Sequence, residues 1–593
     1  MEERFSLLLF RTAWVGSLLG VSATVYFLFG LLGYVHNPLL NSSVVVALLL
    51  GSVFFLSNFF IIPRQTNWPG RIIWAAIVFL IMTEVVLSFL PPISRDELTH
   101  HLAIPKLYVD AGRIVEVPMA PYAYYPMLLD MLYTPWVSWG YDFVPKLIHG
   151  LFAFLTGLLL YAYLGRRMNA VYGLLGCLFY LSTPVIARLS HWGYIDLGMT
   201  FYTTASLLCL LRWREERDKI SWLSIAGLSL GFALATKPNG LVAALLISTL
   251  FLLIIARPPR KRFGALSGEI LLFGGLMLLP FAPWVLKNWF QTGNPFYPLL
   301  GNWFLSSQVA ANGGASFGGL GILEKRGLLY GEDVWQILNL PLKIFLSGQD
   351  DNPQLFDGVL TPILIIFLPW TFKGKWLEEK RLLAGFALLF LLYALFLVDM
   401  RIRYILSIVP PLVILAVYGI FNVYLRIKRP VYLFAGVIFF VAWHSIYLWH
   451  YFREAMPLGY LAGSESRDAY LARMLPEYKT FQYINRSTPP QAKIYLLFIG
   501  RRAYYCDREY FHDGGDLPGY LLAAIRRAKT ADQIAQVLKK KRITHLMIRE
   551  DLLTFFLTHN LTPNQAVVWN EFVQSRLSLN FRDRGHAVYQ VNG

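Results

Sequence analysis

The sequence predicts an α-helical polytopic membrane protein with a small α/β domain at its C-terminal end. Of the 593 residues, 56% are hydrophobic and only 15% are charged, and the mean hydropathy is +0.49. The apolar residues come in runs close to the ~20 residues that an α-helix needs to cross a bilayer. Charged residues become frequent from about residue 453 onwards. We therefore expect a transmembrane module over residues 1–452 and a second domain over residues 453–593.

Thirteen apolar runs have the length and hydropathy of candidate transmembrane helices. The first run, Phe5 to Val35, is longer than a signal-peptide core and has no clear small-residue cleavage site, so we keep it as a span. The expected spans are residues 6–35, 43–63, 72–91, 144–164, 170–188, 196–213, 221–236, 240–256, 266–286, 355–372, 382–399, 404–424 and 431–451.

The positions of lysine and arginine predict how these spans are oriented. With a cytoplasmic N-terminus, every short basic loop, such as Arg166–Arg167 and Arg212–Lys219, faces the cytoplasm, as the positive-inside rule requires. These loops account for much of the net charge of +17, and no nucleic-acid-reading motif is visible, so we expect no nucleic acid partner. The long connections 92–143 and 287–354 and the C-terminal region then lie outside.

The outer regions carry signs of regular structure. Leu98 to Gly112 predicts a short amphipathic helix along the membrane interface. Apolar runs at Ile494–Ile499 and His545–Ile548 predict strands flanking a helix at Ala531–Lys541, which indicates an α/β domain. The glycine-rich stretch Gly313–Gly321 has no strong period, and we expect it to become ordered around substrate. Three cysteines predict no disulfide framework.

The stretch Arg95-Asp96-Glu97-Leu98-Thr99-His100-His101 places two carboxylates where the third span surfaces. A carboxylate at such a place can accept a proton from an attacking hydroxyl or amine, which contributes about 10²–10⁴ in rate, or can help to hold a divalent cation. The structural alternative is that the pair caps or solvates a helix end. The order Glu-x-x-His-His is not the zinc signature His-Glu-x-x-His, so we expect no zinc site. A divalent cation shared with Asp350 or Asp351 stays open.

Four separated motifs resemble one family of membrane enzymes. They are DELTHHLAIPKLYVDAGRIV from Asp96, TKPNGL at 236–241, PWVLKNWFQTGNPFYPL at 283–299 and RIRYILSIVPPL at 401–412. Together they resemble the bacterial polytopic glycosyltransferases of the GT-C fold, which include relatives of the protein O-mannosyltransferases and of the lipid A aminoarabinose transferase. The resemblance runs from about residue 72 to the C-terminus, and the first two spans are an extra hairpin.

The resemblance implies a GT-C fold in a bacterial inner membrane, with the active site and C-terminal domain on the outer face. It implies Asp96 as catalytic carboxylate, with Glu97 as helper or alternate. The implied reaction moves a sugar, with inversion, from a polyprenyl-phosphate-linked donor to a lipid, glycan or protein acceptor. The alternatives are a polytopic lipid or glycan transporter or flippase, which more often shows paired halves, and a scaffold, for which thirteen spans are excessive.

A departing phosphate needs fixed cations near the outer membrane surface. The expected topology offers Lys106, Lys237, Lys287, Arg401 and Arg403. The two arginines are the first choice, because guanidinium binds phosphate through two hydrogen bonds and because Arg403-Tyr404 resembles an Arg-Tyr pair of the family. The alternative is interfacial snorkelling by basic side chains at helix ends.

The remaining candidates are polar or aromatic residues at the expected outer surface. His100 and Asp196 are candidate substrate-binding residues, although an acid at position 196 also suits a helix start. Tyr124 and Tyr125, with Trp192 and Tyr194, are candidates for stacking on sugar, although tyrosine and tryptophan are frequent at every membrane interface. Glu84, Lys146 and His149 lie near or within the spans and are more typical of structural partners.

Overall fold

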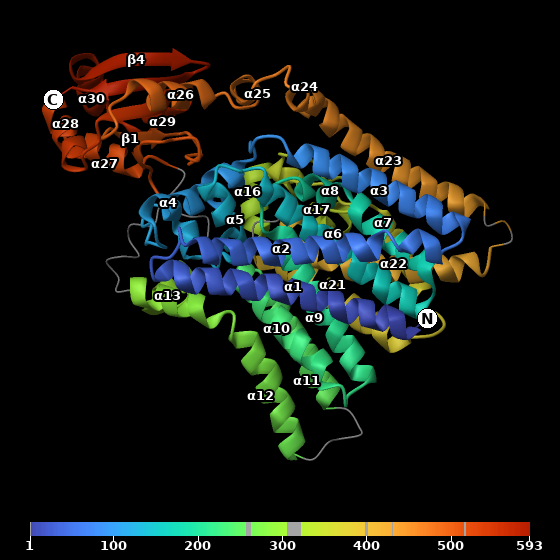
Figure 1. Ribbon diagram of the computed structural model, residues 1–593. Helices are drawn as coiled ribbons and strands as arrows, with labels where there is room; N and C mark the ends of the chain where they lie inside the picture. Colours follow the sequence, from blue (N-terminus) through green and yellow to red (C-terminus); the bar gives the residue numbers. More distant parts are fainter. Residues whose placement is uncertain are drawn as a thin grey trace.

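The computed structural model describes residues 2–256, 263–304, 322–397, 401–427, 429, 431–514 and 517–592, so the expected glycine-rich stretch lies outside the described residues. Most of the described chain is a bundle of apolar helices (Figure 1). The long helices of this bundle are α1 (Glu2–Leu31), α2 (Pro38–Phe59), α3 (Trp68–Ser88), α6 (Val144–Arg167), α7 (Ala170–Ser182), α8 (Pro184–Ser190), α9 (Asp196–Glu215), α10 (Ile220–Thr236), α11 (Gly240–Ile255), α12 (Phe263–Leu278), α13 (Ala282–Thr292), α21 (Leu377–Leu397), α22 (Val409–Tyr424) and α23 (Val431–Ala455).

The chain is an integral membrane protein. Among the described residues, six helices are at least 18 residues long and apolar enough to cross a membrane, and two bent helix pairs, α7 with α8 and α12 with α13, raise this number to eight. α10 and α11 are apolar but have only 17 and 16 residues. The expected number of thirteen spans is therefore not confirmed.

One expected span has a different structure from the one that its sequence predicts. Over residues 355–372 the chain forms only short helices, α19 (Ile363–Ile366) and α20 (Leu368–Thr371). Pro362 and Pro369 interrupt the apolar run, and proline cannot supply the backbone N–H that a continuous helix needs. Part of this run is buried, since Ile363 and Leu364 are inaccessible to solvent, whereas Ile366 and Trp370 are exposed.

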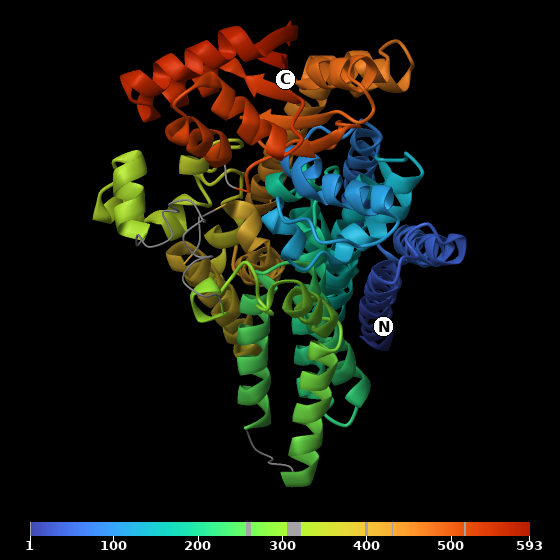
Figure 2. The ribbon, with the colours of Figure 1, turned by 90° about the vertical axis from the view of Figure 1, so that its left-hand side faces the viewer.

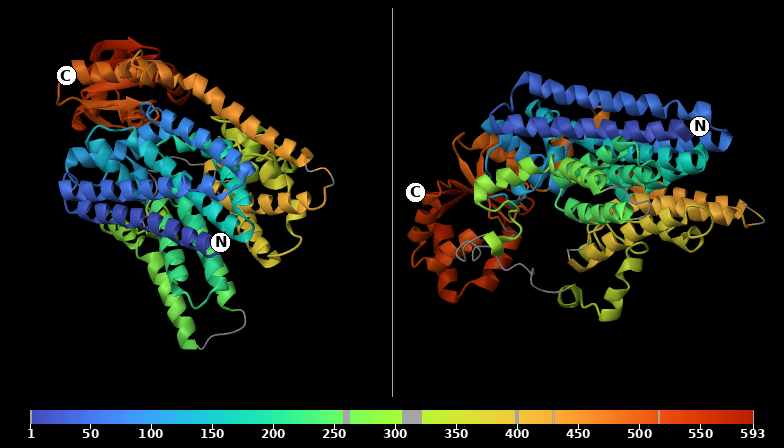
Figure 3. Two further views of the ribbon diagram at one scale, coloured as in Figure 1. Left: turned by 45° about the vertical axis from the view of Figure 1, so that its right-hand side comes forward. Right: turned by 90° about the horizontal axis from the view of Figure 1, so that it is seen from below.

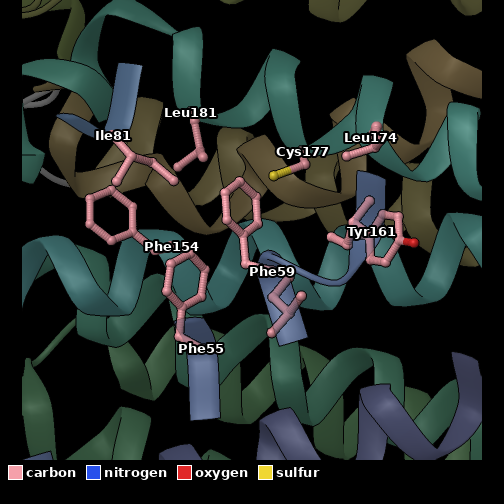
Figure 4. A pocket seen from close by; sticks show the side chains of 10 residues that line it. Phe55, Phe59, Ile81, Phe154, Tyr161, Leu174, Cys177 and Leu181 are labelled. Atoms are coloured by element: carbon pink, nitrogen blue, oxygen red, sulfur yellow. The ribbon is translucent and has the colours of Figure 1, made fainter. Parts of the chain in front are cut away.

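The bundle is held together by apolar side chains. Figure 4 shows one slot between α2, α3, α6 and α7, where Phe55, Phe59, Phe154 and Leu181 point toward one another. Its ten lining residues include no charged group, and the slot has no room for a water molecule. This slot is therefore part of the packing between helices.

Short elements cover the end of the bundle that the sequence predicts to be outside. They are η2 (Glu97–His101), α4 (Ala103–Ala111), η3 (Pro121–Tyr124), α5 (Leu128–Ser138), α14 (Gly301–Phe304), α16 (Ile322–Tyr330), α17 (Val334–Leu338), α18 (Leu340–Lys343), η4 (Pro353–Leu355) and η5 (Ile402–Ile408), while η1 (Ile62–Gln65) follows α2. The expected amphipathic helix is present as α4, which ends at Gly112 with a φ of 66°. This positive φ is a conformation that glycine adopts without strain.

The chain after α23 forms the expected small domain around one mixed sheet. Its helices are α24 (Pro457–Leu461), α25 (Arg467–Met474), α26 (Tyr478–Ser487), α27 (Gly519–Arg527), α28 (Ala531–Lys540), α29 (Glu550–Asn560) and α30 (Pro563–Arg576), and its strands are β1 (Lys493–Leu497), β2 (Glu509–Phe511), β3 (His545–Arg549), β4 (Leu577–Asp583) and β5 (His586–Val591). The strand order is β2-β1-β3-β5-β4, with β1 parallel to β2 and β3 and with antiparallel pairing elsewhere.

The domain lies at one end of the bundle, and the N-terminus lies at the opposite end (Figures 1 and 3). Figure 2 shows it against the outer elements, while α11 and α12 extend away from it. The contacts are specific: Arg467 pairs with buried Asp142, and Lys106 donates to the carbonyl oxygens of Tyr504 (3.0 Å) and Cys506 (3.1 Å). The domain is therefore fixed over the loop that carries Asp96.

Candidate active site

The loop that carries Asp96 is shaped by two prolines and one π-helical turn. Pro91 and Pro92 follow the end of α3, and the turn η2 begins one residue after Asp96 and leads into α4. Single π-turns occur frequently at functional sites, because they change the direction in which side chains leave the backbone. Here the turn brings Asp96, His100 and His101 to one place.

Glu97 is buried and connects this loop to the segment before α9. One of its carboxylate oxygens accepts a hydrogen bond from the backbone N–H of Ser94 (3.0 Å), and the other accepts from the N–H of Gly193. Both oxygens are thus occupied, and Glu97 does not line the cavity described below. Its role as an alternate base stays a prediction, while these contacts favour a positioning role.

We expect Glu97→Gln to lower the free energy of unfolding by about 1–3 kcal/mol, because the glutamine NH₂ group would face a backbone N–H donor that then stays unsatisfied. Thermal and urea unfolding of the purified protein in detergent measure this loss. Glu116→Gln is the matched control, since Glu116 is exposed and accepts from the Tyr124 hydroxyl, which a glutamine oxygen can still do. Equal stability of the two variants would show that Glu97 does not hold the loop.

His149 fixes the segment before α9 from the other side. Its Nε2 accepts from the backbone N–H of Leu197 (2.9 Å), so the proton of a neutral ring lies on Nδ1, which donates to the carbonyl oxygens of Trp192 (2.7 Å) and Leu189 (2.9 Å). The Tyr133 hydroxyl also donates to the carbonyl oxygen of Tyr194. This segment is rigid because buried side chains bind its backbone at several points.

Asp96 forms an ion pair with Arg403, which lies 307 residues further along the chain. The two side chains are only 14% and 12% exposed, and the guanidinium lies over the rings of Tyr194 (5.3 Å) and Tyr404 (5.2 Å). Burial alone would raise the pKa of Asp96, but Arg403, His100 and His101 together hold this pKa well below its usual value. Asp96 is therefore ionised at every physiological pH.

The two histidines beside Asp96 are neutral. Burial lowers the pKa of His100 to about 3 and that of His101 to about 4. His101 Nδ1 lies 2.8 Å from an oxygen of buried Asp130, and the His100 ring stacks on Tyr122 at 4.7 Å. Neutral imidazoles can bind metal or the hydroxyl groups of a sugar.

Asp96, His100 and His101 could hold a metal ion, since their ligand atoms all lie within 4.8 Å of one another. The donor set suits a divalent cation, but the carboxylate of Asp96 already binds Arg403, with which a cation would compete. Asp350 and Asp351, which the sequence offers as further ligands, instead bind Arg188 at 2.7 and 2.9 Å. This arrangement fits a site where guanidinium groups supply the positive charge.

A second ion pair, Asp196 with Lys237, lies next to the first. The Lys237 ammonium lies 4.7 Å from the ring centre of Tyr404. The Arg403 guanidinium also contacts this ring. Asn239 donates to the carbonyl oxygen of Tyr404 (3.1 Å) and so holds the start of η5 in place. The Tyr404 ring therefore contacts two cations, and each cation forms an ion pair with a different aspartate.

Asp96 and Arg403 line a cavity of about 380 Å³. Five arginines and three aspartates line it, a surplus of two positive charges among these residues, and aromatic and apolar side chains form the rest. Arg188 binds Asp350 and Asp351, and Arg401 binds Asp357 at 3.3 Å. The charged lining residues are Arg95, Asp96, Arg188, Asp351, Asp357, Arg401, Arg403 and Arg502. Such a cavity is suited to a phosphate attached to an uncharged group.

Comparison with known proteins identifies the fold. Residues 142–286 match the family model described as dolichyl-phosphate-mannose-protein mannosyltransferase. The crystal structure of apo ArnT from Cupriavidus metallidurans superimposes with a TM-score of 0.52 at 13% identity, over 86% of this chain and 96% of that one. The structure of the same protein bound to undecaprenyl phosphate gives 0.50 at 14%, over 88% and 98%. The chain has the GT-C fold. No curated protein sequence matches it.

The predicted site residues of this GT-C protein fall into two groups. Arg401 and Arg403 line the cavity with Asp96, while Asp196, Lys237 and Tyr404 adjoin it through Arg403. His100 is next to Asp96. The residues outside the cavity lining are Lys106, which binds the C-terminal domain, Lys287, which donates to the carbonyl oxygen of Ala123 (2.7 Å), and Tyr124 and Tyr125, which line a separate crevice.

Other functional candidates in the GT-C protein were not singled out from the sequence. Arg188 lies at the expected outer end of a span, where the positive-inside rule disfavours a basic residue. This position could have indicated a functional role. Asp130 and Arg502 had no comparable signal, because their importance comes from partners far away in the sequence. Glu84 has a structural partner, since its carboxylate lies 2.6 Å from His191 Nδ1.

Proposed function

We propose that this protein is an inverting glycosyltransferase that takes its sugar from a polyprenyl-phosphate-linked donor at the outer face of the membrane. The observation that carries the proposal is the Asp96–Arg403 ion pair in the wall of an arginine-rich cavity. One partner can accept a proton and the other can bind a departing phosphate. The GT-C fold supports it, because the donor of such an enzyme has its lipid tail in the bilayer.

Arg403 has two roles in the proposed mechanism. Without substrate it neutralises Asp96 and keeps the pKa of that carboxyl low, so that Asp96 is a weak base. An arriving donor phosphate competes for the guanidinium. As Arg403 turns toward the phosphate, the buried Asp96 loses its counter-ion and its pKa rises, which makes it a stronger base. Donor binding thus activates the carboxylate.

The chemical step is one displacement at the anomeric carbon. The acceptor oxygen or nitrogen forms its bond to that carbon while the bond from the carbon to the phosphate oxygen breaks. The electron pair leaves with the polyprenyl phosphate, whose new charge Arg403 and Arg401 stabilise. The proton of the acceptor goes to Asp96. Attack opposite the leaving group inverts the configuration.

The proposal is tested by release of the lipid product. Purified protein in detergent is incubated with undecaprenyl-phosphate sugars and with a membrane extract that supplies acceptors, and free undecaprenyl phosphate is measured. We expect release that depends on both the protein and the extract. No release with any of a panel of undecaprenyl-phosphate sugars would contradict the proposal.

The orientation of the protein in the membrane is tested by cysteine labelling. We expect Arg113→Cys to react in intact cells with a maleimide that cannot cross membranes, and Asn169→Cys to react only after the cells are permeabilised. Both positions are exposed, and the native residues Cys177, Cys209 and Cys506 are buried. The reverse pattern would place the Asp96 cavity on the cytoplasmic side and overturn the proposed topology.

A further inference from the structure

The loop of residues 498–502, which follows strand β1 of the C-terminal domain, contacts the Asp96 loop. The Thr99 hydroxyl donates to the carbonyl oxygen of Gly500 (3.5 Å), and just after the loop the backbone N–H of Tyr504 donates to the carbonyl oxygen of Leu98 (3.2 Å). β1 is parallel to both of its neighbours, and ligands of parallel sheets bind at the carboxyl ends of the strands. The 498–502 loop lies at such an end, and through Arg502 it forms part of the wall of the Asp96 cavity.

The backbone of the 498–502 loop is strained. Phe498 and Arg501 have φ values of 59° and 60°, and Gly500 between them has 65°. The left-handed region is unfavourable for residues other than glycine, and such residues persist where surrounding contacts hold them, frequently at ligand-binding sites. Two such residues within four positions indicate that surrounding contacts hold this loop in an unfavourable backbone conformation.

Arg502 is the residue that this loop contributes to the cavity. Its side chain lines the cavity wall with Asp96, Arg401 and Arg403. One Nη donates to Glu477 at 3.0 Å, and the side chain stays 34% exposed. Its Nε, like that of Arg403, is buried and has no hydrogen-bond partner among the described residues. The protein thus leaves both guanidinium groups incompletely bonded, and a ligand that draws them into the cavity could supply the missing acceptors.

We propose that Arg502 is a substrate-binding residue through which the C-terminal domain completes the donor site, by donating to the phosphate oxygens of the polyprenyl phosphate opposite Arg403. The inference rests on the proposed function and extends it, because it assigns the C-terminal domain a direct part in binding substrate. The 498–502 loop then holds Arg502 in position, and Glu477 orients its guanidinium.

The test measures the Kd of undecaprenyl phosphate for the full-length protein in detergent. We expect Arg502→Gln to raise the Kd about tenfold, as the loss of one charge-assisted hydrogen bond would. Arg527→Gln, which removes an exposed arginine from α27 of the same domain, should leave the Kd unchanged. Thermal unfolding of each variant establishes that it is folded.

A second variant separates binding from a structural role. If Arg502 only anchors Glu477, Glu477→Gln will weaken binding as much as Arg502→Gln does, and the inference is wrong. If Arg502 binds phosphate, Glu477→Gln keeps a side-chain oxygen that can still accept from Arg502 and orient its guanidinium, so the Kd stays near the wild-type value. Equal Kd values for the wild type and Arg502→Gln would overturn this inference alone. Wild-type protein that does not bind it overturns the proposed function as well.

Discussion

Asp96→Asn is expected to lower the rate of sugar transfer at least about a hundredfold, because the loss of a general base costs about 10²–10⁴ in rate. Asparagine has nearly the same shape as aspartate and can still accept a hydrogen bond from Arg403, so the fold should be kept. The loss should appear in kcat, while the Kd of undecaprenyl phosphate should rise little or even fall, since Arg403 is freed from its counter-ion.

The control for Asp96→Asn is Asp110→Asn, which removes an exposed carboxylate from the same outer connection, at a position outside the cavity lining. It should transfer sugar at the wild-type rate. A folded Asp96→Asn protein with wild-type activity would remove Asp96 as the base, and the ion pair with Arg403 would then have to be structural.

Arg403→Gln is expected to have an effect of similar size, about 10²–10³ in kcat, because it removes the cation nearest to the leaving phosphate. It also changes the pH profile. In the wild type without donor, Arg403 keeps the pKa of Asp96 below its usual value, so Asp96 stays ionised as the pH falls through the acid range. Without Arg403 the largest charge that opposes the effect of burial is lost, and this pKa rises. Because kcat/KM reports the donor-free enzyme, we expect kcat/KM of the variant to be lost at a higher pH than that of the wild type as the pH falls.

Initial rates between pH 4 and 8 measure this difference between Arg403→Gln and the wild type. Arg401→Gln is the matched comparison, since Arg401 lines the same cavity but pairs with Asp357, at 3.3 Å. We expect it to be less impaired and to keep the wild-type profile in acid. Identical profiles for both variants and the wild type would show that Arg403 does not control the protonation of Asp96.

The sequence predicted much of this architecture because the relevant signals are local. Hydropathy identified the membrane module, the stop at Gly112 identified α4, and short apolar runs identified β1 and β3. Hydropathy fails where an apolar run does not form one continuous helix. Residues 355–372 are as apolar as a span, yet Pro362 and Pro369 divide them into short helices.

The site was predicted only in part, for a related reason. Asp96 stood out as one of two adjacent carboxylates where a span surfaces, and Arg401 and Arg403 stood out because basic residues at outer helix ends oppose the local charge bias. That Asp96 meets Arg403 depends on packing between α9 and η5, which no local pattern encodes. Lys106 has the same signal as Arg403 but holds the C-terminal domain instead, and no local pattern indicates that Arg502 of that domain lines the cavity.

The most direct test is an experimental structure of the protein with undecaprenyl phosphate bound. The phosphate is expected in the cavity that Asp96 lines, within hydrogen-bonding distance of Arg403, with the ion pair to Asp96 broken and the lipid tail leaving toward the membrane. A phosphate bound elsewhere, for example beside Arg166 and Arg167 at the opposite end of the bundle, with the Asp96–Arg403 pair intact, would contradict the account.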